Sequence, residues 1–177
     1  MAGFDPISVT HAEPSALDAT GYRNQARGFD PRSGEGARRF GGRFNPPRSF
    51  PVLYLCTTRS CAIAELTRQA DRQSIDVAQL LPRELPKVHA DLTDVIDLTD
   101  DATLAARGIA AADVVRDDHR LTRQVGEAVY EQRLQAILTP SATGVDNVLA
   151  IFPENLAGSV LETELIEVWA TIQDLGT

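Results

Sequence analysis

Residues 52–69 read VLYLCTTRSCAIAELTRQ and join a strand pattern to a helix pattern within one short stretch. The apolar run 52–56 is rich in residues that favour strands. Three hydroxyl residues between positions 57 and 60 can cap a helix N-terminus, which predicts a helix continuing to about Gln69. The stretch is therefore predicted to fold as a strand, a tight turn and a helix.

The preceding residues, 21–51, contain six glycines and four prolines. This composition opposes both helices and long strands and predicts an ordered loop region. Long loops inside compact domains are usually functional or disordered. Residues 1 to about 20 mix small and polar residues with Pro6 and Pro14, and we interpret them as an arm or an edge strand.

The remaining sequence predicts an α+β fold. Helical spacing of apolar residues predicts a helix over 118–133 that packs on the sheet. Asp100 or Asp101 can cap a brief helix that ends before Gly108. Five further strands are predicted at residues 87–92, 95–98, 136–139, 148–152 and 160–171. Because strands and helices mix without regular βαβ repetition, we expect a single domain with a mixed, largely antiparallel sheet.

Length and composition restrict the class of protein. A chain of 177 residues is about one domain, and 43% hydrophobic with 24% charged residues is typical of a folded, soluble protein. No apolar run approaches the roughly 18 residues that a membrane span needs, and no signal peptide is recognisable. We therefore expect a cytoplasmic location and no membrane association.

Neither the cysteines nor the histidines indicate a metal site. Cys56 and Cys61 have no histidine near them, so we expect buried, reduced packing residues. His11, His89 and His119 show no metal-binding spacing, and nothing places one of them beside a nucleophile. We expect surface or core roles for all three and no bound metal.

Arginines are concentrated in residues 21–60, which hold eight arginines and two acidic residues although the chain has a net charge of −8. Affinity for nucleic acid comes largely from neutralising many phosphates over a broad surface. The acidic remainder of the chain therefore argues against direct nucleic-acid binding. A local arginine cluster suits a small phosphorylated ligand better, and a solvated basic loop is the alternative.

Four residues stand where plain packing would not choose them. Arg43 follows two glycines, which let a ligand approach the backbone, and its guanidinium can hold a phosphate with two parallel hydrogen bonds. Glu65 interrupts an apolar run beside small residues, so it faces a cleft or, alternatively, solvent. Tyr54 is either a stacking platform or a half-buried sheet tyrosine, and Ser141 either points into a site or starts a turn.

Taken in order, these residues resemble the RES family, which is named for its arginine, glutamate and serine. One block runs from GGRFNP at 41–46 to AIAE at 62–65, and Arg43, Tyr54 and Glu65 stand eleven residues apart in turn. A second block runs from Gly126 through 137–141 to 147–149. The family usually has tryptophan at the position of Phe44.

The resemblance implies a fold similar to ADP-ribosyltransferases, with an arm over 1–20, a RES domain over 21–177 and motif blocks over about 22–153. It also implies a toxin of a toxin–antitoxin pair that depletes NAD+ by cleaving the nicotinamide–ribose bond, by phosphorolysis or hydrolysis. NAD+ would be a substrate, with no cofactor. The partner would be an Xre-type helix-turn-helix antitoxin.

The same resemblance implies roles for individual residues. Glu65 would stabilise the positive charge that develops on the ribose. Arg43 and Arg23 would hold the pyrophosphate or an attacking phosphate, Tyr54 would stack on the nicotinamide or ribose side, and Ser141 would hydrogen-bond the ribose or carboxamide. The expected catalytic residues are Glu65, Arg43, Tyr54 and Ser141, and the expected substrate-binding residues are Arg23, Tyr22, Gly42, Asn45 and Asn147.

The identity of the nucleophile separates the possible activities. An arginine-rich pocket with one carboxylate and no histidine in the motifs favours inorganic phosphate as co-substrate, because phosphate arrives already charged. An ADP-ribosyltransferase that modifies a protein would need the same NAD+ site and an acceptor surface. A non-enzymatic module that binds nucleic acid through its arginine loop would show a steep salt dependence.

Overall fold

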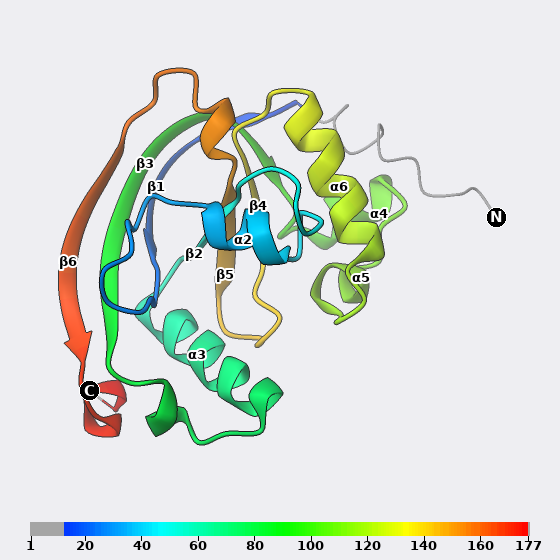
Figure 1. The fold of residues 1–177 in the computed structure, drawn as a ribbon. Helices are drawn as coiled ribbons and strands as arrows, with labels where there is room; N and C mark the ends of the chain where they lie inside the picture. The colour runs from blue at the N-terminus through cyan, green and yellow to red at the C-terminus, as the bar shows by residue number, and fades with distance from the viewer. Residues whose placement is uncertain (1–12, 177) are drawn as a thin grey trace.

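A mixed sheet of six strands forms the centre of this computed structural model, which describes residues 13–176 (Figure 1). The strands lie in the order β1-β2-β5-β4-β3-β6. Their bounds are β1 Ser15–Tyr22, β2 Leu53–Cys56, β3 Arg83–Asp97, β4 Ala136–Pro140, β5 Asn147–Ile151 and β6 Leu161–Trp169. β3 and β4 run parallel, and the other neighbours run antiparallel.

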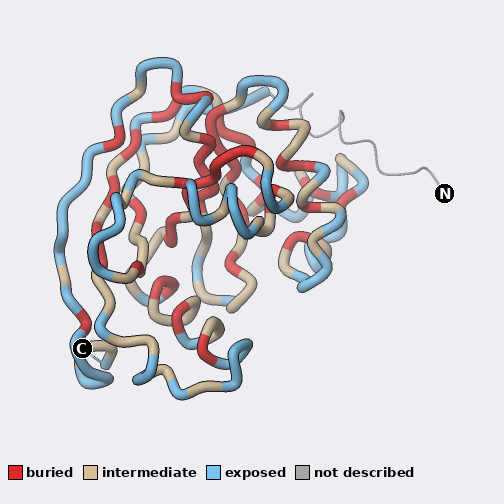
Figure 2. The backbone as a smooth tube through the Cα atoms, viewed as in Figure 1, coloured by how far each residue is buried: buried red, intermediate tan, exposed pale blue. Residues whose placement is uncertain are grey.

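The strand pairings close a ring. β1 pairs with β2 through Tyr22 and Cys56, and it also pairs with β3 along most of its length. β2, β5, β4 and β3 complete the circuit. β6 lies outside the ring on the first half of β3, and most of its residues are exposed (Figure 2).

Helices cover two regions of the sheet. α3 (Arg59–Gln73) lies at one end, and α4 (Asp101–Ala106), α5 (Ala111–Val115) and α6 (Arg120–Glu131) gather on one side (Figure 1). The Thr58 hydroxyl caps α3 by accepting a hydrogen bond of 3.1 Å from the Cys61 amide. The short α2 (Glu35–Phe40) and three 3-10 turns, Val77–Leu80, Pro153–Asn155 and Ile172–Leu175, complete the described elements.

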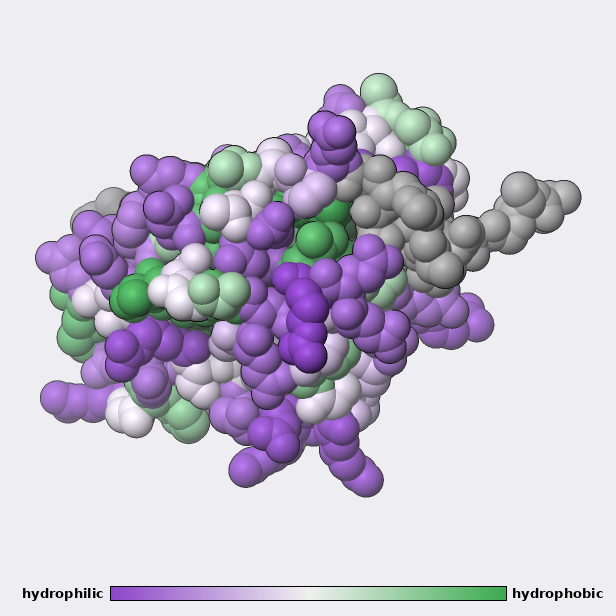
Figure 3. Space-filling model, turned by 90° about the horizontal axis from the view of Figure 1, so that it is seen from above, coloured by the Kyte–Doolittle hydropathy of each residue, from purple (hydrophilic) through white to green (hydrophobic). Residues whose placement is uncertain are grey.

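One part of the core lies between the sheet and the helices, and a second cluster is built almost entirely from strand residues. Val125 and Val129 of α6 are fully buried in one cluster with Phe44 and Phe152. The surface seen from above is mostly hydrophilic, with small, separate hydrophobic patches (Figure 3). No helix within residues 13–176 combines the length and apolar character that crossing a membrane requires.

The predicted architecture is confirmed in its main features. The fold is α+β with a mixed, largely antiparallel sheet, residues 52–69 form a strand, a turn and a helix, and the helix predicted over 118–133 is α6. Both cysteines are free and buried, as expected. β1 crosses the boundary expected at residue 20, and residues 1–12, which contain His11, lie outside the described part of the chain.

Two secondary-structure predictions are wrong. The two segments predicted at 87–92 and 95–98 form one strand, β3, which ends at Asp97. The strand continues through residues 93 and 94 because the Gln135 side chain accepts the Thr93 amide at 2.7 Å. The predicted loop over 21–51 contains α2, which fits between glycines: Gly34 precedes it, and Gly41 ends it with φ +77°. The helix α5 is a further element that the sequence pattern did not indicate.

Candidate functional site

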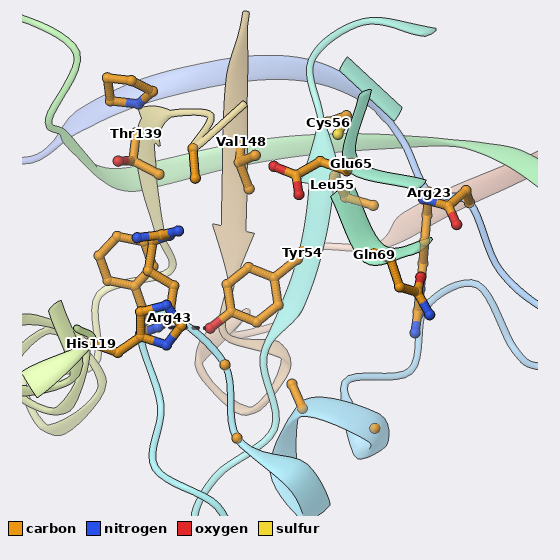
Figure 4. Close-up of a pocket in the computed structure, with 18 of the residues that line it drawn as sticks. Arg23, Arg43, Tyr54, Leu55, Cys56, Glu65, Gln69, His119, Thr139 and Val148 are labelled. Carbon is orange, nitrogen blue, oxygen red and sulfur yellow. Dashed lines mark hydrogen bonds between the residues drawn. The ribbon is translucent and has the colours of Figure 1, made fainter. Parts of the chain in front are cut away.

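A cavity of about 620 Å³ opens where the strand ends, α3 and the start of α6 meet (Figure 4). This volume lies in the range usual for small-molecule sites. Six of the nine expected site residues line it: Tyr22, Arg23, Gly42, Arg43, Tyr54 and Glu65. The structure thus brings together residues from β1, the loop after α2, β2 and α3.

The loop that carries Arg43 is held very closely by its neighbours. A β-carbon on Gly42 would come within 2.6 Å of the Tyr54 hydroxyl oxygen, so only glycine fits without a shift. A β-carbon on Gly126 would come within 1.7 Å of the Phe44 carbonyl oxygen. The backbone of α6 therefore packs directly on this loop, and both glycines serve close approach.

The Tyr54 hydroxyl is committed to the same loop. It donates to Asn45 Oδ1 at 2.9 Å and accepts the Phe44 amide at 2.8 Å. Burial raises the pKa of Tyr54 well above its ordinary value, which keeps the hydroxyl protonated at neutral pH. The aromatic ring is the part of Tyr54 that remains for a ligand.

Arg43 connects the cavity to the segment between α5 and α6. Its Nη1 donates to the carbonyl oxygens of Val114 at 3.0 Å and Arg116 at 2.9 Å. Burial lowers the pKa of Arg43, and the nearby Glu65 carboxylate acts in the opposite direction. Nη1 thus binds two main-chain carbonyls, while the other donors of the planar guanidinium remain for an anion.

Glu65 is oriented by Ser141. The Ser141 hydroxyl donates to Glu65 Oε1 at 2.8 Å, and it also lies 2.6 Å from Thr143 Oγ1. Ser141 is buried and stands outside the cavity lining. The Ser141 hydroxyl therefore affects the cavity only indirectly, by holding the Glu65 carboxylate.

Two expected binding residues also stand behind the cavity wall. Asn45 is fully buried, and its Nδ2 donates to the Ala37 carbonyl at 2.7 Å. The main-chain carbonyl of Asn147 accepts the Thr57 amide at 2.9 Å, which joins the turn before α3 to β5. Neither asparagine lines the cavity, so the structure places both as supports of lining segments.

His119 lines the cavity, which corrects the expectation of a surface or core role for it. Its Nε2 is buried and has no hydrogen-bond partner among the described residues. Burial lowers the pKa of His119, and Arg43 and Arg123 lower it further, so the ring is neutral at pH 7. The argument for a phosphate nucleophile from the lack of a nearby histidine therefore fails.

Other lining residues were missed by sequence reasoning. Gln69 and Arg72 lie four and seven residues after Glu65 on α3, so helical periodicity could have identified them. The Thr139 hydroxyl is buried at the wall and has no partner within the described residues. Since buried polar atoms are nearly always paired, Thr139 and His119 are free to bind a ligand there.

The arrangement suits an anionic ligand that contains an aromatic or sugar group. Arginines supply charge-assisted hydrogen bonds, the Tyr54 ring supplies a flat apolar surface, and Glu65 can stabilise positive charge. Within residues 13–176, no group of three or more histidine, cysteine or acidic side chains is placed to hold a metal ion.

Comparisons with known proteins place these features in a family. A family model described as the RES domain matches residues 18–170. The NAD(+) phosphorylase MbcT of Mycobacterium tuberculosis is 36% identical over 137 residues, which are 76% of this chain and 74% of that protein. The Mycobacterium bovis protein of the same name matches equally. The crystal structure of the M. tuberculosis MbcT–MbcA toxin–antitoxin complex aligns with a TM-score of 0.77 and 29% identity, covering 93% of this chain and 94% of that chain.

Proposed function

This chain belongs to the RES domain family, and from that premise we propose that it is a toxin that depletes NAD+ by phosphorolysis of the nicotinamide–ribose bond. The observation that carries the proposal is the Glu65 carboxylate, which Ser141 holds at the wall of a cavity that Arg23, Arg43 and Tyr54 also line. The 36% identity to NAD+ phosphorylases supports the choice of substrate and reaction.

Glu65 acts on the ribose. As nicotinamide departs, positive charge develops at the anomeric carbon, and a carboxylate beside it stabilises the oxocarbenium-like transition state. The hydrogen bond from Ser141 fixes the rotamer of Glu65 and leaves its second oxygen for the ribose. Ser141 is thus a positioning residue in this proposal.

The arginines and Tyr54 bind the dinucleotide. Arg43 and Arg23 hold the pyrophosphate, and the Tyr54 ring stacks against the nicotinamide side. Each arginine is oriented by hydrogen bonds from its Nη1 to main-chain carbonyls, that of Ser33 at 2.6 Å for Arg23 and those of Val114 and Arg116 for Arg43. The binding groups are therefore in place before the ligand arrives, which reduces the entropy lost on binding.

The bond changes balance without a redox step. A phosphate oxygen bonds to the anomeric carbon as the bond from that carbon to the nicotinamide nitrogen breaks. The electron pair of the broken bond goes to the ring nitrogen of the positively charged pyridinium, which leaves as neutral nicotinamide. The other product is ADP-ribose-1″-phosphate, and the proton of HPO4²⁻ stays on the phosphate.

The proposal includes an antitoxin protein as partner, of the Xre helix-turn-helix type, acting in the cytoplasm. It would close the cavity and supply any DNA binding of the pair. The solved toxin–antitoxin complex that aligns with this chain supports a protein partner. Phe40, which is 76% exposed, lies on α2 beside residues that line the cavity and offers an apolar contact at its rim.

The decisive experiment is incubation of the purified protein with NAD+ in phosphate and in phosphate-free buffer, followed by mass spectrometry. We expect nicotinamide and ADP-ribose-1″-phosphate in phosphate buffer. Glu65→Gln should fold normally and lose most turnover, while Glu127→Gln on α6 makes the same chemical change away from the cavity and should keep it. Unmodified ADP-ribose at equal rates in both buffers would establish a glycohydrolase instead.

A further inference from the structure

A second cavity of about 300 Å³ adjoins the first and shares part of the α3 wall with it. Glu65, Gln69 and Arg72 line both cavities. Arg68 and Arg83 line only the second one. The Glu65 carboxylate therefore stands between a larger space and a smaller one.

The smaller cavity is strongly cationic. Three guanidinium groups, those of Arg68, Arg72 and Arg83, line it together with one carboxylate, that of Glu65. Asp117 offsets part of this charge, because its Oδ1 accepts from Arg68 at 2.7 Å and from Arg72 at 2.5 Å. A net positive charge remains around the cavity, and it favours an anion.

Arg83 has no carboxylate partner among residues 13–176 that would balance its charge. Its Nη2 and Nε donate to Asn24 Oδ1 at 2.8 and 3.2 Å, which are hydrogen bonds to a neutral group. Burial lowers its pKa, and no carboxylate within the described residues counters that effect. Arg83 also repels the nearby Arg23. A partly buried guanidinium in this position is stabilised when an anion binds beside it.

We propose that the smaller cavity is the binding site for inorganic phosphate, with Arg83 and Arg72 as its direct contacts. This inference rests on the proposed function, since it names where the co-substrate of that reaction binds. Arg68 uses both of its terminal nitrogens, Nη1 for the Ala142 carbonyl at 3.1 Å and Nη2 for Asp117, so it supports the wall and its charge adds to the field. Arg72 uses only Nη2 for Asp117 and keeps its other donors for the anion.

The position fits the order of bond changes. The dinucleotide occupies the larger cavity, where Arg43, Tyr54 and His119 lie on one side of Glu65 (Figure 4). Gln69 and Arg23 lie on the other side in the same view. Because Glu65 and Gln69 line both cavities, phosphate in the smaller cavity lies next to a ribose that contacts Glu65. Arg72, which lines both cavities, contacts phosphate at the point where it meets the ribose.

The kinetic test separates phosphate binding from dinucleotide binding. We expect Arg83→Gln to raise the KM for phosphate at least tenfold, the loss typical of one charge-assisted contact, and to leave the KM for NAD+ within about twofold. Arg83→Lys should fall between wild type and Arg83→Gln. Arg107→Gln is the matched control, because Arg107 is also half-buried and lies near α4, outside both cavities. A raised KM for NAD+ with an unchanged KM for phosphate would overturn the assignment.

A binding test distinguishes failure of the site from failure of the proposed function. Calorimetric titration of inorganic phosphate into the protein without NAD+ should show binding to wild type and to Arg107→Gln, and at least tenfold weaker binding to Arg83→Gln. This result supports the site even if wild type releases no nicotinamide. Equal phosphate affinity in wild type and Arg83→Gln, or none in either, would overturn it. Circular dichroism melting should confirm that each variant is folded.

Discussion

Replacing Tyr54 by phenylalanine removes one hydroxyl group and keeps the aromatic ring at the cavity wall. In the wild type that hydroxyl satisfies two groups at once, the Phe44 amide at 2.8 Å and Asn45 Oδ1 at 2.9 Å. Phe44 and Asn45 are both fully buried, so water cannot take the place of the lost partner. The substitution therefore leaves one donor and one acceptor unsatisfied in the interior.

The expected cost follows from these two groups. Each buried polar group that loses its partner costs about 1–3 kcal/mol, so we expect Tyr54→Phe to lower the free energy of unfolding by about 3 kcal/mol. For a domain of this size, that corresponds to a fall in Tm of roughly 6–12 °C. The ring remains for stacking, but the Arg43 loop loses its tie to β2, so the KM for NAD+ should rise more than kcat falls.

Urea unfolding and steady-state kinetics check both parts. Tyr130→Phe is the matched control, because the Tyr130 hydroxyl donates to Glu154 in an exposed setting and its loss should cost little. If Tyr54→Phe unfolds at the same urea concentration as wild type, the two hydrogen bonds of the Tyr54 hydroxyl are not what holds the Arg43 loop. A large fall in kcat at unchanged KM would instead give the hydroxyl a part in the chemistry.

Three further predictions concern single residues around the cavity. Arg43→Ala should raise the Kd for NAD+, measured by calorimetry, at least tenfold. Arg43→Lys should recover only part of the affinity for NAD+, because an ammonium lacks the planar fork of a guanidinium, and full recovery would contradict the bidentate contact. Gly126→Ala should lower the unfolding free energy in urea by about 3 kcal/mol or more, since its new methyl group would lie 1.7 Å from the Phe44 carbonyl oxygen, and unchanged stability would refute the close packing. The lowered pKa of His119 means that the unfolded chain binds more protons than the folded one below about pH 6.5, so the unfolding free energy should fall as pH decreases from 7.5 to 5.5. His119→Gln should flatten that pH dependence, and an equal slope in both proteins would contradict the burial of His119.

The parts of the site that could be predicted from sequence are those fixed by local structure. The helix of residues 59–73 is capped by a hydroxyl beside it in sequence, and its periodicity places Glu65 on a definite face. The close packing of the Arg43 loop is likewise accompanied by a glycine pair in the sequence. Signals of this kind can be read from neighbouring residues in the sequence, without knowing which distant segments they contact.

The parts that could not be predicted depend on contacts between distant segments. His119 reaches the cavity because α6 packs on the Arg43 loop through Gly126, and no pattern near His119 indicates that contact. Ser141 lies 76 residues from Glu65, so motif spacing identified it without showing that it binds the carboxylate. Arg83 belongs to none of the motifs, and its proposed role rests on the lack of a carboxylate partner among residues 13–176.

The closed ring of strands determines when the complete cavity can first form during synthesis of the chain. β1 can pair with β3 only after β3 has been synthesised, and β2 can pair with β5 only after β5 has been synthesised. The residues that line the larger cavity extend from Tyr22 to Val148. Pairings so far apart in the chain form late and slowly. At about 5–20 residues per second, the ribosome spends roughly 7–30 s on the segment up to Val148, and during that time no fragment has a complete site. The complete cavity therefore belongs to a nearly finished chain and to no shorter fragment.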